Sequence, residues 1–254
     1  MADHRVIEKP PLGGRALFGG APAEQNRRAW NEIHRRRSAA IPLELGLRPE
    51  LRERMPPLHG LRILQPQCAT GETLRDLHGL GALVTGVDIS EEALALAREL
   101  VPEARLVRAD VQALPPDLRQ GEFDLVLADE GCIPWLHDLA GWARGIAEAL
   151  RPGGVLVQLE AHPIAACLGE EGRWEESYFD EGVQRSVGWS HFDLPGEAAR
   201  EEKHQRHWRL GEVVTALAGA GLVVRALEEF PQVGSWRPDD ARLPGRFFLR
   251  GEKP

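Results

Sequence analysis

The fold of this chain is decided by ILQPQCATGETL (63–74) together with VTGVDIS (84–90). Each stretch begins with an apolar run of the length and composition of a short buried strand. The first run leads through a turn of small residues into a helical pattern, and the second leads into a helix that Ser90 caps. Strand, helix and strand in this order predict a βαβ unit with parallel strands and a right-handed crossover.

The same alternation continues on both sides of this unit. We expect strands at 61–66, 82–88, 104–110, 123–129, 155–161, 222–230 and 246–252. Helices are expected at 23–40, 48–55, 71–81, from 91 onward, at 137–150 and at 210–221. The pattern predicts an α/β fold with a doubly wound, seven-stranded Rossmann-like sheet between two helical layers. The sheet is expected to be mostly parallel, with an antiparallel last strand.

We expect a single domain over residues 1–254. Its parts are an N-terminal arm with cover helices (1–58), a ligand-binding core (61–161), a lid or insertion (162–207) and the C-terminal part of the sheet (208–254). The lid segment breaks the strand–helix rhythm, and a long aperiodic segment is usually functional. We expect four of its aromatic side chains to wall or cap a substrate pocket: Trp174, Tyr178, Phe179 and Trp189.

Composition excludes several functional classes. The formal net charge is −8, which argues against a nucleic-acid partner, because a phosphate backbone is bound mostly by Lys and Arg. No apolar run approaches the roughly 20 residues of a membrane helix, and the N-terminus lacks the apolar core of a signal peptide. The three cysteines, Cys68, Cys132 and Cys167, lack metal-site spacing and predict free thiols. We therefore expect a cytoplasmic protein that does not interact with membranes.

The turn after the first strand and the acidic end of the second predict a ligand site. Ligands of open parallel sheets bind at the carboxyl ends of the strands, and a carboxylate at Asp88 is placed to accept both hydroxyls of an adenosine ribose. The alternative is a plain turn, with Asp88 capping the following helix. The glycines of a dinucleotide site are absent, because Gln67 and Ala69 occupy their positions. The turn therefore favours an adenosine ligand without a pyrophosphate.

In this order and spacing, residues 61–160 resemble the core of the class I S-adenosylmethionine-dependent methyltransferases, and most of all a bacterial small-molecule branch. The family's turn reads hydrophobic-Asp-hydrophobic-Gly-x-Gly-x-Gly, and of the residues 65–71 that match it only Gly71 keeps a glycine. Asp88 matches the acidic residue of the second strand, and Asp110 matches the acidic position beside the adenine. Similarity extends over about four-fifths of the chain through NRRAWNE (26–32), FDLVLADEG (123–131), LRPGG (150–154), LGEVVTALAGAGLVV (210–224) and RFFLRGEK (246–253).

The resemblance implies an S-adenosylmethionine-dependent methyltransferase (EC 2.1.1.-) that methylates a small molecule, releases S-adenosylhomocysteine and exists as a monomer or homodimer. The residues that it implies for cofactor binding are Trp30, Gln67, Cys68, Ala69, Gly71, Asp88, Ile89, Asp110, Val111, Asp129 and Glu130. A general base is needed only when the acceptor arrives protonated. Glu130 and His162 are the predicted catalytic residues, and Asp129, His137 and Glu160 are further candidate bases at the strand ends.

Three other functions remain open at this point. Gln65 and Gln67 replace an Asp and a Gly of the family, which leaves a non-catalytic adenosyl-ligand binder with a decayed turn as an alternative. A nicotinamide oxidoreductase is disfavoured by the missing glycines, and an RNA methyltransferase by the net charge. The pair His204 and His207 has metal-like spacing, but we favour a solvated charged helix there and expect no metal.

Overall fold

The computed structural model describes residues 21–36, 46–169, 172–188, 199–231 and 242–254. The strands of its main sheet are β1 (Arg62–Pro66), β2 (Leu83–Asp88), β3 (Arg105–Arg108), β4 (Phe123–Ala128), β5 (Leu150–Ala161), β8 (Val223–Pro231) and β9 (Pro244–Glu252). The helices are α1 (Ala21–Arg36), α2 (Pro49–Arg52), α3 (Glu72–Gly79), α4 (Glu91–Leu100), α5 (Leu139–Ala149), α6 (Pro163–Ala166) and α7 (Leu210–Gly219). Short 3-10 turns occur at Val111–Ala113, Pro116–Leu118 and Ile133–Trp135. No helix among the described residues is both long and apolar enough to cross a bilayer.

The main sheet has seven strands in the order β3-β2-β1-β4-β5-β9-β8. Strands β1 to β5 are parallel, and β9 runs antiparallel to both of its neighbours, β5 and β8. The predicted fold class and the antiparallel last strand are therefore confirmed. The chain order reverses between β1 and β4, so the crevice of a doubly wound sheet is expected beyond the carboxyl ends of these two strands.

Two apolar cores lie on opposite faces of the sheet, because neighbouring side chains of a strand alternate between its faces. Leu64 packs on the face that α5 and α7 cover, around the fully buried Trp142. Ile63 packs on the other face with α2, α3 and α4, around Leu74 and Leu77. The expected three layers of helix, sheet and helix result from this alternation.

The start of α4 agrees with the sequence prediction, whereas the start of β5 differs from it. Ser90 caps α4 as predicted, since its Oγ accepts a hydrogen bond from Ala93 N at 3.1 Å. β5 was expected to begin after the break at 151–154. It begins instead at Leu150, directly after α5, because Leu150 already pairs with Phe123 and the register then shifts before Val155. The Pro-Gly-Gly run therefore lies within the strand as an irregularity.

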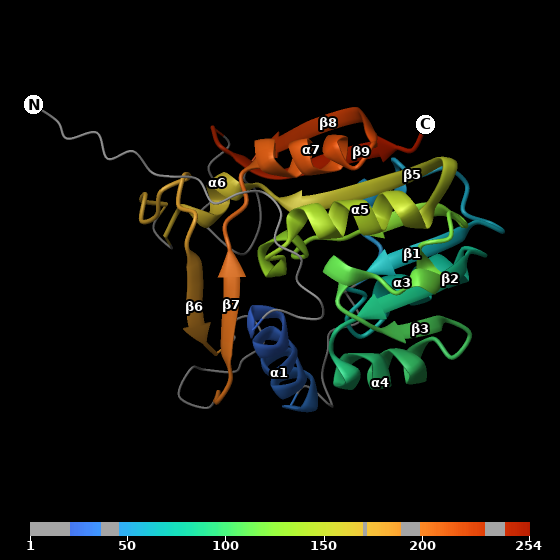
Figure 1. The fold of residues 1–254 in the computed structure, drawn as a ribbon, viewed down its shortest axis with the longest axis horizontal. Helices are drawn as coiled ribbons and strands as arrows, with labels where there is room; N and C mark the ends of the chain where they lie inside the picture. Colours follow the sequence, from blue (N-terminus) through green and yellow to red (C-terminus); the bar gives the residue numbers. More distant parts are fainter. Residues whose placement is uncertain (1–20, 37–45, 170–171, 189–198, 232–241) are drawn as a thin grey trace, which may run out of the picture.

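Helix α1 and a two-stranded hairpin stand beyond the edge where the parallel strands end (Figure 1). The hairpin consists of β6 (Val183–Val187) and β7 (Glu202–Arg206). The helix predicted around His204 is wrong: this segment is a strand, and β6 and α1 flank it. The predictions for the arm 1–20, for residues 37–45 and for Trp189 fall outside the described residues.

Candidate functional site

The turn after β1 adopts a backbone conformation that favours glycine at three alternate positions. Gln67 has a φ of 54°, Ala69 of 47° and Gly71 of 88°. A non-glycine residue in the left-handed region costs roughly 1–3 kcal/mol and persists only where the surroundings impose it. The chain therefore keeps the conformation of the predicted turn although two of its three glycine positions carry side chains. A Cβ on Gly71 would lie 3.0 Å from Ala97 Cβ, so α3 and α4 approach closely there.

The carboxylate of Asp88 is tied to this turn. Its Oδ2 accepts a hydrogen bond from Ala69 N and its Oδ1 from Ser90 N, both at 2.9 Å, and only 8% of the residue is exposed. Burial raises the pKa of the Asp88 carboxyl to about 6, against the lowering by these backbone donors. A carboxylate offers about four acceptor positions, so each oxygen can still accept a further hydrogen bond.

The neighbouring cysteine side chains are inert. Cys68 fills the space that Gly86 leaves open, since a Cβ on Gly86 would lie 2.8 Å from Cys68 Sγ. Burial raises the pKa of the Cys68 and Cys132 thiols well above the usual value. A thiol held protonated is a poor nucleophile. The two cysteines can therefore shape the site by packing.

Asp110 and Val111 follow β3, and the Asp110 side chain binds the next turn of the chain. Asp110 Oδ1 accepts hydrogen bonds from Gln112 N and Gln112 Nε2, each at 3.0 Å. Gln112 Oε1 in turn accepts from the backbone N of His137 and of Asp138, each at 2.5 Å. The loops after β3 and β4 are thereby joined. Oδ2 of Asp110 carries none of these bonds.

Glu160 holds the loop after β4 in place. Its Oε2 accepts from Cys132 N at 2.8 Å and Ile133 N at 2.9 Å. Its Oε1 accepts from Gly131 N at 2.7 Å and from Ala161 N at 2.9 Å. Burial raises the pKa of the Glu160 carboxyl to about 7, and the backbone donors oppose that rise. The sequence offered Glu160 as a candidate base, whereas its four hydrogen bonds indicate a structural role.

Asp129 and Glu130 follow β4 and form ion pairs that the sequence analysis missed. Arg48 approaches Glu130 Oε2 at 2.9 Å and Asp129 Oδ1 at 3.6 Å. Arg246 Nε donates to Glu130 Oε1 at 3.2 Å, and Thr73 Oγ1 donates to Asp129 Oδ2 at 3.1 Å. Burial raises the pKa of the Asp129 carboxyl. Arg246 stands in the predicted last strand, but only its pairing in the sheet brings it to Glu130.

His162 lies just beyond the end of β5, and both of its ring nitrogens are engaged. Nδ1 accepts from Ile164 N at 3.2 Å, and Nε2 lies 2.9 Å from Glu229 Oε1. Burial lowers the pKa of the His162 imidazole, while Glu229 opposes that shift. A neutral ring with Nδ1 as acceptor donates its Nε2–H to Glu229. The partners of the two ring nitrogens are thus Ile164 N and Glu229, and neither nitrogen is bonded to Glu130.

Helix α1 connects the hairpin to the loop after β4. Trp30 meets Trp135 edge-on, with ring centroids 5.0 Å apart, and stacks on His34 at 5.6 Å. Asn26 exchanges two hydrogen bonds with the backbone of His204, at 2.8 Å and 2.7 Å. Trp30, one of the predicted cofactor-binding residues, is therefore brought to the loop after β4.

The two histidines with metal-like spacing do not form a metal centre with their neighbours. His204 Nε2 lies 2.7 Å from Glu202 Oε1, and His207 packs edge-on against Tyr178. Within the described ranges, no group of three His, Cys, Asp or Glu side chains is arranged to hold a metal ion. Trp174 and Phe179, which the sequence analysis expected to wall or cap the pocket, are 60% and 70% exposed.

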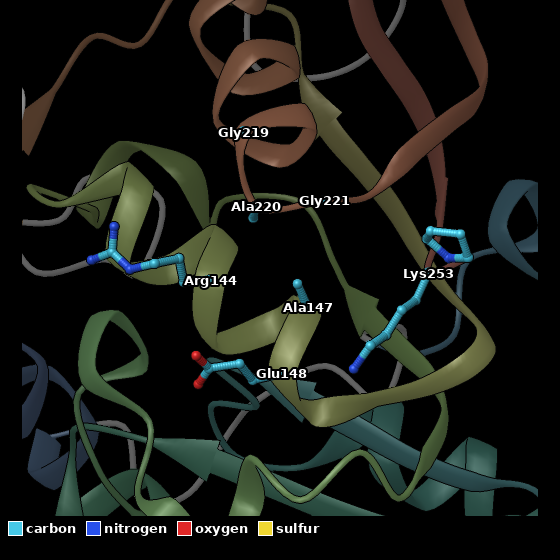
Figure 2. Close-up of a pocket in the computed structure, with 8 residues that line it drawn as sticks. Arg144, Ala147, Glu148, Gly219, Ala220, Gly221 and Lys253 are labelled. Atoms are coloured by element: carbon cyan, nitrogen blue, oxygen red, sulfur yellow. The ribbon is translucent and has the colours of Figure 1, made fainter.

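A depression of about 470 Å³ lies away from this site (Figure 2). It is lined by the ends of α5 and α7 and by the end of β9, including Arg144, Glu148 and Lys253. Helix α5 ends where β5 begins, so this hollow lies at the amino edge of the sheet, opposite the edge that carries Asp88. It takes no part in the candidate site.

Comparisons with known proteins agree with this geometry. Residues 64–158 match the family described as "Methyltransferase domain". The malonyl-[acyl-carrier protein] O-methyltransferase of Enterobacter lignolyticus is 31% identical over 150 residues, 58% of this chain and 54% of that protein. The trans-aconitate 2-methyltransferase of Shigella dysenteriae is 30% identical over 140 residues, 53% of this chain and 54% of that protein. The chain thus spans about half the length of the curated relatives it matches.

A solved structure extends the likeness beyond the core. The S-adenosylmethionine-dependent methyltransferase from Mesorhizobium loti aligns with 81% of this chain and 96% of its own, at 28% identity and a TM-score of 0.60. The turn after β1 and the acidic end of β2 are among the features on which the resemblance was based, and the structure places them together. Residues 64–158 therefore match a methyltransferase domain, and the chain as a whole resembles the class I S-adenosylmethionine-dependent methyltransferases.

Proposed function

We propose that this protein transfers a methyl group from S-adenosylmethionine to a small-molecule acceptor. The proposal rests on the hydrogen bonds that fix the Asp88 carboxylate. Ala69 N, in the turn after β1, donates to one of its oxygens, and Ser90 N donates to the other. A fixed, buried carboxylate at the end of the second strand suits the two hydroxyls of a ribose. The left-handed backbone at Gln67 and Ala69 supports binding over a decayed turn, because a turn without function has no reason to retain this strain.

The residues around Asp88 and the turn after β1 fit the cofactor. Asp88 is proposed to hold the ribose, and the adenine is proposed to lie between the ends of β2 and β3, beside Ile89, Asp110 and Val111. The amino-acid end is proposed to lie against the remaining binding residues: Trp30, Gln67, Cys68, Ala69, Gly71, Asp129 and Glu130. When bound, the cofactor supplies an electrophilic methyl group on a sulfonium, which leaves as a thioether once the acceptor has taken the methyl group.

The contribution of the protein is alignment and exclusion of water. Helix α1 is bound to both the hairpin and the start of α4, so it can cover the cofactor edge of the sheet. Holding two reactants in line can lower a barrier by roughly 7–11 kcal/mol. A sulfonium is also attracted to an aromatic face, which gives Trp30 a second reason to lie near the site.

The acceptor is proposed to be a small molecule. The names of the two curated relatives refer to malonyl-[acyl-carrier protein] and trans-aconitate. The net charge of −8 is unfavourable for a nucleic-acid acceptor. The general-base roles of Glu130 and His162 stay predictions. They are disfavoured because both side chains already have partners: two arginines for Glu130 and Glu229 for His162.

The test begins with isothermal titration of the purified protein with S-adenosylmethionine, S-adenosylhomocysteine and, as a control, NAD. We expect micromolar binding of both adenosyl ligands and none of NAD. The release of S-adenosylhomocysteine is then measured with a panel of small organic acids, amines and thiols. Binding without release across such a panel would favour the non-catalytic alternative, and an absence of adenosyl binding would overturn the proposal.

A further inference from the structure

Gln67 occupies a position at which the backbone favours glycine, and its side chain bridges two loops. Its Nε2 donates a hydrogen bond to Cys132 O at 3.0 Å. Gln67 directly follows β1, and Cys132 lies in the loop after β4. The contact therefore crosses the point where the order of the sheet reverses, which is where a doubly wound sheet binds its ligand.

The oxygen of the same amide is unpaired. Gln67 Oε1 is buried and has no hydrogen-bond partner among the described residues. Oε1 of Gln65, a residue that is only 3% exposed, is in the same situation. The assignment of the Gln67 amide follows from Cys132 O, which can only accept, so the nitrogen must face it and the oxygen must point elsewhere. Two residues near the end of β1 thus each carry an unpaired buried acceptor.

The unpaired oxygen and the left-handed backbone at Gln67 both cost stability, and only the bond from Nε2 to Cys132 O offsets that cost. A buried acceptor without a donor destabilises the fold, and so does a left-handed φ of 54° at a residue with a side chain. Glycine would remove the backbone strain and the unpaired oxygen together. Their persistence at a proposed binding crevice indicates that a ligand completes the hydrogen bonding.

We propose that Gln67 is a specificity-determining residue: its Oε1 accepts a hydrogen bond from the α-ammonium group of the adenosyl ligand while its Nε2 holds the loop after β4. This inference rests on the proposed function. An unpaired acceptor selects the ammonium over the carboxylate of the ligand's amino-acid end, because a carboxylate offers no hydrogen to donate. Gln65 Oε1 is a second acceptor for the same group.

Three ligands test the assignment in wild type and in Gln67→Leu. S-adenosylhomocysteine carries both ammonium and carboxylate, S-adenosyl-3-thiopropylamine carries only the ammonium, and 5′-methylthioadenosine carries neither. We expect Gln67→Leu to lower the affinity for the two ligands that carry the ammonium group by about 10- to 100-fold. This is the usual effect of removing a hydrogen bond to a charged group. The affinity for 5′-methylthioadenosine should stay within about twofold, because that ligand has no group for the amide to hold.

Two further variants keep the test decisive. Gln67→Gly removes the side chain without backbone strain, so it should fold, and it should show the same ligand dependence with a smaller loss. Gln120→Leu is the matched control: it removes another glutamine whose Nε2 donates to a backbone carbonyl, that of Pro116, at an exposed site. We expect its affinities to equal those of wild type.

The outcomes separate this inference from the proposed function. If wild type binds none of the three ligands, the proposed function fails. If wild type binds them and neither Gln67 variant changes their relative affinities, the role of Gln67 is overturned while the proposed function stands. A loss confined to S-adenosylhomocysteine would mean that the amide recognises the carboxylate, and the assignment to the ammonium would be wrong.

Discussion

Asn31 of α1 and Ser90 at the start of α4 are joined by a buried hydrogen bond, in which Ser90 Oγ donates to Asn31 Oδ1 at 2.7 Å. The same serine donates its backbone N–H to Asp88. On its other side, α1 binds the backbone of the hairpin through Asn26 and Glu32, the latter accepting from Arg200 N and Glu201 N. Hydrogen bonds of α1 therefore connect the proposed ribose-binding carboxylate, through Ser90, to the hairpin.

Substitution of Asn31 should loosen this link. In Asn31→Ala the buried Ser90 hydroxyl loses its acceptor, which costs about 1–3 kcal/mol. We expect faster hydrogen exchange at the amides of α1 and a several-fold weaker affinity for S-adenosylhomocysteine. Arg35→Ala is the control, because Arg35 pairs with Glu92 at 3.4 Å while 57% of its side chain is exposed, and such pairs contribute little. Equal exchange rates in both variants would contradict the role given to Asn31.

Asp88→Ala should lower the affinity for adenosyl ligands without unfolding the protein. Leaving the ribose hydroxyls unpaired costs about 1–3 kcal/mol, or about 5- to 150-fold in Kd. Asp124→Ala is a matched control, since Asp124 also accepts a backbone N–H, from Arg62 at 2.8 Å, but at the amino end of β4. Titration calorimetry should show the loss only in Asp88→Ala, and an unchanged Kd in that folded variant would refute the placement of the ribose.

The affinity for S-adenosylhomocysteine should depend on pH through Asp88. The carboxyl has a pKa of about 6 in the fold because burial raises it. Below pH 6 it is protonated and loses acceptor strength, so the Kd should be constant above about pH 7 and rise toward tenfold per pH unit below 6. Measurement between pH 5 and 8 should give this curve in wild type and a flat one in Asp88→Asn. Parallel curves would assign the titration to another group.

The same pKa has the opposite consequence for stability. An unfolded aspartate has a pKa of about 3.9, so between about pH 4 and 6 the folded chain retains a proton that the unfolded chain has lost. The contribution of Asp88 to the free energy of unfolding therefore falls as pH rises through this window. In ligand-free protein, Asp88→Asn should lose this component of the pH dependence in denaturant unfolding. If the free energies of unfolding of wild type and Asp88→Asn differ by the same amount at pH 4 and at pH 6, this role of Asp88 is contradicted.

The sequence predicted the sheet far better than the cover and the loop contacts. Period and β-branched runs locate β1 to β5, because buried strands need apolar side chains. The charged strand around His204 was mistaken for a helix, since β7 is held by β6 and by the side chain of Asn26 rather than by an apolar face of its own. The same limit applies to Arg48 and Arg246, whose pairing with Glu130 depends on contacts between segments far apart in the chain.

Glu160→Gln should destabilise the loop after β4. A glutamine offers one acceptor oxygen where the carboxylate offers two, so some of the four backbone N–H donors would face its NH₂ group. We expect a loss of about 2–4 kcal/mol and a Tm lower by roughly 5–15 °C. Glu148→Gln, which breaks an exposed pair with Arg119, should change Tm little. Similar melting of the two variants would show that the loop does not depend on Glu160.

His162→Asn tests whether this residue serves as a general base. Asparagine is a good N-cap, so its side chain can still accept the N–H of Ile164 and preserve the start of α6. Because both ring nitrogens of His162 are already engaged, we expect kcat to fall by less than about tenfold, whereas removal of a general base costs roughly 10²–10⁴. The pH profile of kcat should also keep its shape. Loss of its acidic limb together with a hundredfold fall in kcat would instead establish His162 as the base.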